Sequence, residues 1–318
     1  MLTIFKKAAI AGVMTLAAGA ALAEGYPEKP IEVIVGYSAG GGTDVMARTT
    51  MPFIEKYLGN GASLVVKNVP GASGQIGITE VANAAPDGYT LGTFNLPGMM
   101  ARTLDREAGY DRDSFTYLAN VVNDPNVIVS SKDSGINTMD DLIAAAKENP
   151  LAITVGMSSL GGDDHFLLIK LQKMTETEFT IVPFKGSAPA RTAVMGGHVA
   201  VGIFNVSEVA KFAGELNILG VAQPERSEFA PDAPTFREQG LDLINGSLRG
   251  VVAPAGLPDD IAAKLRDAFE KAAQDPEFVK AMADTANPVA VVTGQEFREL
   301  TDSLYDLAKE AWETTPWN

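Results

Sequence analysis

Three glycine-rich segments of the 318-residue chain follow runs of β-branched residues and precede runs with helical spacing. They read YSAGGGTD at residues 37–44, PGASG at residues 70–74 and MSSLGGD at residues 157–163. Each would place unpaired backbone N–H groups at a helix N-terminus, where the amides and the helix dipole favour an anion. The serines that can add hydroxyl donors are Ser38, Ser73, Ser158 and Ser159. The pattern predicts an anion-binding site, and its alternative is that each segment is only a tight turn.

Catalytic and metal-binding patterns fit the sequence less well. The chain has no cysteine, which excludes disulfides and thiolate chemistry, and its two histidines, His165 and His198, show no nucleophilic partner. Asp163, Asp164 and His165 could ligate a metal, but adjacent side chains point in different directions, so we expect the first turn of a helix. We therefore predict a non-enzymatic protein without metal or cofactor. A hydrolase on the same scaffold is the alternative.

The amino-acid composition indicates which kinds of molecule the protein can bind. The chain carries 25 Lys+Arg against 40 Asp+Glu, a formal net charge of −15, and 46% of its residues are hydrophobic. Such a hydrophobic content is typical of a folded protein. Nucleic-acid binding needs clustered cations, so the acidic balance argues against it. We expect a monomer that binds a small molecule.

The N-terminal 23 residues have the features of a secretory signal peptide. Lys6 and Lys7 precede a short apolar stretch, and residues 21–23 read ALA, which matches a cleavage site. A membrane anchor is the alternative, although the apolar stretch is short for a helix that spans a bilayer. The sequence therefore predicts export to the periplasm.

The rest of the chain alternates strand and helix patterns in two series. Residues 31–95 read β-α-β-α-β, and a second series begins near residue 126, where Thr138 is the expected N-cap of a helix. This order predicts an α/β protein with two parallel or mixed sheets in two lobes, and a ligand cleft between them. We assign residues 24–123 and 248–318 to lobe 1 and residues 124–247 to lobe 2.

Long segments then resemble one known family. They read YPEKPIEVIVGYSAGGGTDVMAR, VVKNVPGASGQIGITEVANAAPDGYTL and YDRDSFTYLANV, followed by GMSSLGGDDHFLLIKLQK and VPFKGSAPARTAVMGGHV. In this order they resemble the periplasmic solute-binding proteins of tripartite tricarboxylate transporters, also called the Bug family. The resemblance implies a two-lobed, type II-like binding protein that closes on an organic acid and delivers it to the membrane subunits of the transporter.

The resemblance also implies ligand-binding positions. From the first lobe they are Tyr37, Ser38, Ala39, Gly40, Gly41, Thr43, Asp44, Gly71, Ala72, Ser73 and Gly74. From the second lobe they are Ser158, Ser159, His165, Lys185, Gly186 and Asn205. The chain departs from the family pattern where Gly36 and Ser38-Ala39 replace two prolines and where Ala200 replaces an aspartate.

Arg249 is a further candidate, because a planar guanidinium pairs bidentately with a carboxylate. The alternative is an arginine on a hinge strand that pairs with a surface acid. Since Lys185 and Arg249 are the cations that we can place near the cleft, we expect a C4–C6 dicarboxylate or an aromatic carboxylate in preference to citrate.

Overall fold

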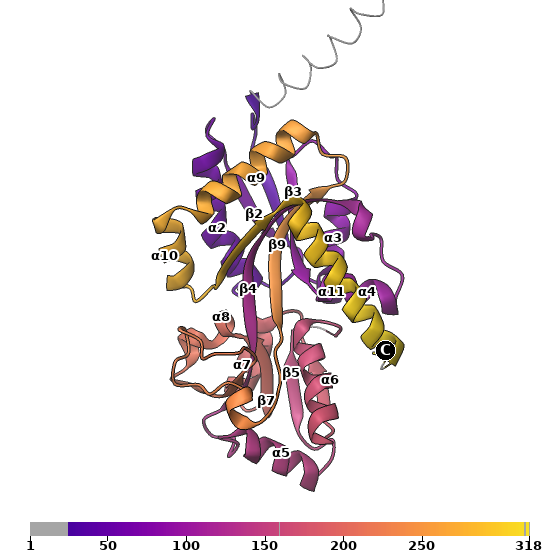
Figure 1. Ribbon diagram of the computed structural model, residues 1–318, viewed down its shortest axis with the longest axis vertical. Coiled ribbons are helices and arrows are strands. Elements are labelled where there is room, and N and C mark those ends of the chain that lie inside the picture. The colour runs from indigo at the N-terminus through magenta and orange to yellow at the C-terminus, as the bar shows by residue number, and fades with distance from the viewer. Residues whose placement is uncertain (1–24, 159, 315, 318) are drawn as a thin grey trace, which may run out of the picture.

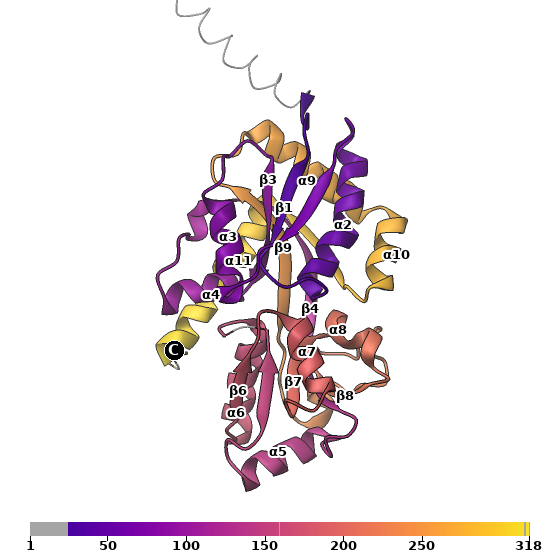
Figure 2. The same cartoon turned by 180° about the vertical axis from the view of Figure 1, so that it is seen from behind.

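The computed structural model describes residues 25–158, 160–314 and 316–317. The predicted signal peptide lies outside these residues. The described chain is an α/β structure with a mixed sheet, as predicted. Figures 1 and 2 show its elements in two groups, with β4 and β9 running between them.

The first group is built on a half-sheet in which three parallel strands meet two antiparallel ones. Its strands are β1 (Ile31–Val35), β2 (Leu64–Asn68), β3 (Thr90–Leu96), β9 (Gly246–Pro254) and β10 (Val289–Thr293). Its helices are α2 (Gly42–Leu58), α3 (Gln75–Ala82), α4 (Gly98–Asp105), α9 (Asp259–Ala273), α10 (Pro276–Asp284) and α11 (Gly294–Thr314). The C-terminal helices α9 and α10 thus pack on α2, and α11 packs on α4 (Figure 1).

The second group repeats the plan with shorter strands. Its strands are β5 (Thr154–Met157), β6 (Thr180–Pro183), β7 (Val201–Asn205) and β8 (Leu216–Val221). Its helices are α5 (Met139–Glu148), α6 (Asp163–Thr175), α7 (Ser187–Met195) and the short α8 (Val206–Val209). Thr138 caps α5 as predicted, since its hydroxyl accepts a hydrogen bond from the Asp141 N–H at 3.1 Å.

One long strand, β4 (Phe115–Ser131), belongs to both half-sheets. Its first part pairs with β9 and β10, and its last part, from Asn126 to Ser131, pairs with β7 and β8. The hydrogen-bonded path runs β2-β1-β3-β9-β4-β7-β5-β6. The two predicted half-sheets are thus joined into one hydrogen-bonded path, because a 17-residue strand is long enough to pair on both sides of the junction.

Glycine lets β9 pack closely at the centre of the first half-sheet. A Cβ on Gly250 would lie 2.6 Å from the Ala119 carbonyl oxygen on β4, and closer still to the ring of Phe297 on α11. Phe297 is fully buried, so neither neighbour can move freely. Strand and helix can approach this closely only where the residue has no side chain.

We therefore expect Gly250→Ala to lower the free energy of unfolding by about 1–3 kcal/mol, the usual cost of overpacking. Gly214→Ala is the matched control, since a Cβ there would meet nothing within 4 Å. Its effect should stay within about 0.5 kcal/mol. Denaturant unfolding followed by circular dichroism measures both, and equal effects of the two substitutions would contradict the packing argument.

Candidate ligand-binding site

A small, partly open cavity lies where the two groups of elements meet. Its volume, about 20 Å³, is room for about one water molecule. The predicted residues that line it are Tyr37, Gly41, Thr43, Ser158, Asn205 and Arg249. The other lining residues are Gly42, Asn95, Gly98, Gly162, Asp163, Ser187, Glu208 and Ser247. The cavity therefore draws on α2 and β3 from one group and on α6, α7 and α8 from the other.

The first predicted loop turns sharply into α2. Gly40 takes a left-handed conformation (φ 77°), and its N–H donates to Asp44 Oδ2 at 2.9 Å. Asp44 Oδ1 accepts hydrogen bonds from Arg48 and Asn68, each at 2.9 Å. Asp44 therefore braces the loop from within and does not line the cavity. Ser38, Ala39 and Gly40 also lie outside its lining.

The second predicted loop, residues 71–74, lies behind the first. The hydroxyl of Tyr37 donates to the Ser73 carbonyl oxygen at 3.2 Å, and Gly74 lies against the same ring. Tyr37 reaches the cavity, but Gly71, Ala72, Ser73 and Gly74 do not line it. This loop positions the tyrosine.

The third loop leads into α6 and carries two adjacent carboxylates. Asp164 Oδ2 accepts hydrogen bonds from the Ser158 N–H at 2.6 Å and the Ser158 hydroxyl at 2.7 Å. Asp163 Oδ2 accepts from Asn126 at 2.6 Å and from Asn205 at 3.0 Å. Burial raises the pKa of Asp163, and burial with the neighbouring Asp163 carboxylate raises the pKa of Asp164 to about 8. Ser159 lies outside the described residues.

His165 is a structural residue of this loop. Its Nδ1 accepts a hydrogen bond from the Gly161 N–H at 3.0 Å, and its ring packs edge-on against Trp317. Burial lowers the pKa of His165 to about 4, so the imidazole is neutral at physiological pH. His165 does not line the cavity. Within the described ranges, no group of three or more acidic or histidine side chains is arranged to hold a metal ion.

The N-terminus of α7 faces that of α2 across the cavity. A Cβ on Gly186 would lie 2.6 Å from Ser38 Oγ, and one on Gly41 would lie 3.2 Å from Ser187 Oγ. Gly186 (φ 127°) thus allows the two loops to touch. Lys185 is exposed and Gly186 is buried, and neither lines the cavity. Ser187 does line it, although the predicted positions end one residue earlier, at Gly186.

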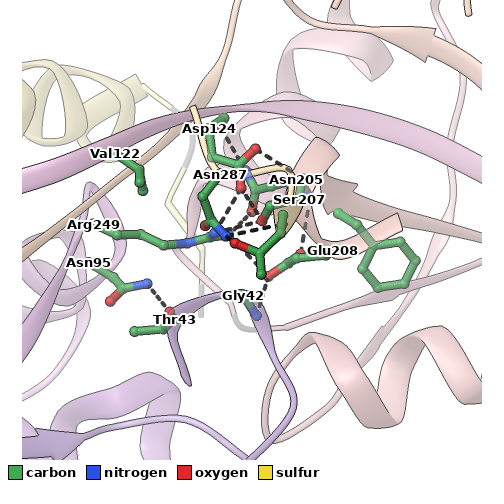
Figure 3. Close-up of polar contacts among 12 residues, drawn as sticks. Gly42, Thr43, Asn95, Val122, Asp124, Asn205, Ser207, Glu208, Arg249 and Asn287 are labelled. Carbon is green, nitrogen blue, oxygen red and sulfur yellow. Dashed lines mark hydrogen bonds and ion pairs between the residues drawn. The ribbon is translucent and has the colours of Figure 1, made fainter. Parts of the chain in front are cut away.

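Arg249 on β9 sits at the centre of a buried polar cluster (Figure 3). Its Nη1 donates to Asp124 Oδ2 at 2.7 Å and to the Ser207 hydroxyl at 3.0 Å. Its Nη2 donates to Asn205 Oδ1 at 2.7 Å and to Glu208 Oε1 at 3.0 Å. The guanidinium therefore pairs with protein carboxylates, the second of its two expected roles, but these acids are buried and not on the surface.

The cluster joins the two groups of elements. Asp124 lies on β4 and Arg249 on β9, whereas Glu208 caps α8 by accepting from the Asn205 N–H at 3.0 Å. The Gly42 N–H at the start of α2 also donates to Glu208, at 3.3 Å. A Cβ on Gly42 would lie 2.5 Å from Arg249 Nη1, so only glycine fits there. One amide of the predicted anion site is therefore already occupied by a protein carboxylate.

We expect Arg249→Ala to lower the free energy of unfolding by about 3–5 kcal/mol, because Asp124 and Glu208 would be left buried without their cation. Arg226→Ala, which removes a half-exposed ion pair with Glu238, should have a far smaller effect. Thermal and denaturant unfolding measure both variants. A marginal loss in Arg249→Ala would show that the cluster is not a structural centre.

We further expect stability to fall as the pH rises from 7 to about 8 and to level off between 8 and 9. Folded Asp164 holds a proton that the unfolded chain has already lost, so the unfolding free energy decreases until the pH exceeds the folded pKa of about 8, above which Asp164 is deprotonated in both states. His165 is neutral in both states in this range and does not oppose the trend. Melting temperatures across this range test it, and Asp164→Asn should flatten the profile. A wild-type profile as flat as that of the variant would contradict the raised pKa.

No helix within the described residues has the length and apolar character needed to cross a bilayer.

The sequence of residues 46–309 matches the family described as tripartite tricarboxylate transporter family receptor. The protein BugT of Bordetella pertussis is 31% identical over 316 residues, covering 96% of each chain.

Two solved structures show the same fold. Rpa4515 of R. palustris, determined with adipate, is 27% identical with a TM-score of 0.85, covering 91% of this chain and 98% of its own. MatC of Rhodopseudomonas palustris, determined with malate, is 26% identical with a TM-score of 0.79, covering 92% and 99%. The chain therefore belongs to the receptor family of tripartite tricarboxylate transporters, the Bug family of non-enzymatic periplasmic solute-binding proteins.

Proposed function

We propose that the protein is an extracytoplasmic receptor that binds a small organic acid and delivers it to the membrane subunits of a tripartite transporter. The observation that carries this proposal is the convergence of three helix N-termini, those of α2, α6 and α7, on one cavity. The dipoles of these helices, and the N–H groups that protein carboxylates leave unpaired, favour a carboxylate. Residues 1–23 would direct export to the periplasm and be removed there.

The two groups of elements act as lobes in this proposal. Lobe 1 comprises residues 24–123 and 248–318, lobe 2 comprises residues 124–247, and β4 and β9 are the strands that connect them in a type II-like arrangement. Ligand sites for small molecules measure about 300–1,000 Å³, far more than the present cavity. The lobes must therefore separate to admit a ligand. The contacts that part include Gly41 with Ser187 and Gly98 with Gly162.

The N-terminus of α7 is the best place for a ligand carboxylate. The first turn of α2 contains Asp44 and that of α6 contains Asp163 and Asp164, whereas the first turn of α7 contains no acidic residue. Ser187 adds a hydroxyl that lines the cavity. An anion at α7 therefore meets the helix dipole without a competing carboxylate from the same turn.

The ligand class follows from the scarcity of cations. Arg249 is the one cation among the residues that line the cavity in the described chain, and it is already paired with two carboxylates. Citrate would bring three negative charges to such a site. We therefore rank C4–C6 dicarboxylates and aromatic carboxylates above citrate. The malate and adipate bound to the two relatives support this class.

A thermal-shift screen of organic acids tests the proposal. A ligand at a hundredfold excess over its Kd stabilises the folded protein by about 2.7 kcal/mol. We expect stabilisation by at least one C4–C6 dicarboxylate or aromatic acid and less by citrate at equal concentration. If no mono-, di- or tricarboxylate raises the melting temperature, the protein does not bind organic acids.

With the best ligand of that screen, Ser187→Ala should weaken binding by about 0.5–1.5 kcal/mol, the net value of one hydrogen bond. Ser303→Ala, at an exposed position of α11, removes the same hydroxyl from a residue that does not line the cavity and should leave Kd unchanged. Calorimetry measures both. An unchanged Kd in Ser187→Ala would exclude the hydroxyl as a ligand contact.

A further inference from the structure

The cavity is bordered by more negative than positive groups. Asp163 and Glu208 line it, and Asp124 lies behind them in contact with Arg249, the single cation among the described residues that line the cavity. Arg249 already forms ion pairs with Asp124 and Glu208. The charge of Asp163 is not matched by a cation, since its hydrogen bonds come from the neutral amides of Asn126 and Asn205.

Unused hydrogen-bonding atoms of both kinds border the same cavity. Both hydrogen bonds to Asp163 end on Oδ2, which leaves Oδ1 without a protein donor among the described residues. Asn95 is 8% exposed and its Oδ1 has no partner, and Arg249 is 1% exposed and its Nε has none. Buried polar atoms are normally satisfied. A ligand that fits this cavity must therefore offer donors as well as acceptors.

An amino acid meets these requirements better than a plain diacid. A dicarboxylate offers acceptors alone at neutral pH, and it would add two negative charges beside Asp163 and Glu208. Like charges at a partly buried site disfavour binding, whereas an ammonium group would pair with Asp163 and reduce the local negative charge. The α7 N-terminus can hold the carboxylate of the same molecule.

We propose that the ligand carries an ammonium group next to its carboxylate and that Asp163 selects it through a direct ion pair. This inference rests on the proposed function, because it assigns a ligand class to the same cavity. Asp163 is then the specificity-determining residue, and the preferred ligands are amino-substituted C4–C6 dicarboxylates. A hydroxyl group in the same place can donate one hydrogen bond but cannot offset charge, so it should serve less well.

Calorimetry of the purified protein with matched ligands tests this inference. Succinate, L-malate and L-aspartate share a C4 skeleton with hydrogen, hydroxyl or ammonium at one carbon, and glutarate with L-glutamate and adipate with L-2-aminoadipate extend the comparison. In at least one chain length we expect the amino compound to bind ten times or more tighter than its diacid. At C4, malate should lie between the two.

Two further results are distinguishable. If diacids bind and every amino analogue binds equally or more weakly, the selection by Asp163 is wrong while the proposed function stands. If no compound of any chain length binds, both the selection by Asp163 and the proposed C4–C6 ligand class are wrong. The wild-type series decides these cases whether or not a variant folds.

Asp163→Asn then tests the residue itself. Its amide oxygen can keep the hydrogen bonds from Asn126 and Asn205, while its NH2 group replaces the free oxygen with a donor. The ratio of diacid Kd to amino-acid Kd should fall at least tenfold. Asp140→Asn removes the same charge from an exposed position in the first turn of α5 and should leave that ratio unchanged. An unchanged ratio in a folded Asp163→Asn variant would overturn the assignment.

Discussion

The buried guanidinium of Arg249 is the interaction on which the arrangement of the two groups of elements depends. It is 1% exposed and donates four hydrogen bonds to groups on β4 and around α8, two of them to carboxylates. Removing two carboxylates and a guanidinium from water is costly, so such a cluster contributes less to net stability than its contacts suggest. Its effect on the relative orientation of the surrounding elements is larger than its effect on stability. A planar group with fixed donor directions sets how β4, β9 and α8 lie relative to one another.

This arrangement also determines which polar groups remain unpaired and available to a ligand. Glu208 accepts from Arg249, from the α8 N-cap and from the Gly42 N–H of α2, so the cluster is complete only where the two groups of elements are in contact. Burial raises the pKa of Asp124 to about 6 even though Arg249 and Ser207 favour its charged form. The centre of the molecule is thus already crowded with charge. The ligand site that we propose therefore lies at the edge of this cluster, among groups that the cluster leaves unused.

The sequence predicts the local parts of this structure and misses the parts that depend on distant residues. The strand–glycine–helix order at residues 31–58 and the Thr138 cap follow from nearest neighbours, and the structure has both. The partners of Arg249 lie 41 to 125 residues away in sequence, so no local pattern could separate a ligand clamp from an internal ion pair. β10 was not predicted because it is a half-buried edge partner of β4, without the continuous buried run of a central strand.

The glycine-rich loops show why a correct pattern can still assign the wrong roles. In each of the two loops that reach the cavity, a carboxylate of the chain accepts a backbone N–H: Asp44 from Gly40, and Asp164 from Ser158. Amides at a helix N-terminus favour an anion, as the pattern predicts. In a chain with a net charge of −15, however, that anion can be a carboxylate side chain of the protein itself. An acidic receptor for an acid must therefore keep some helix N-terminus clear of its own carboxylates. The first turn of α7 meets that condition, and for this reason we propose it as the position where the charge of the ligand, and not that of the protein, completes the site.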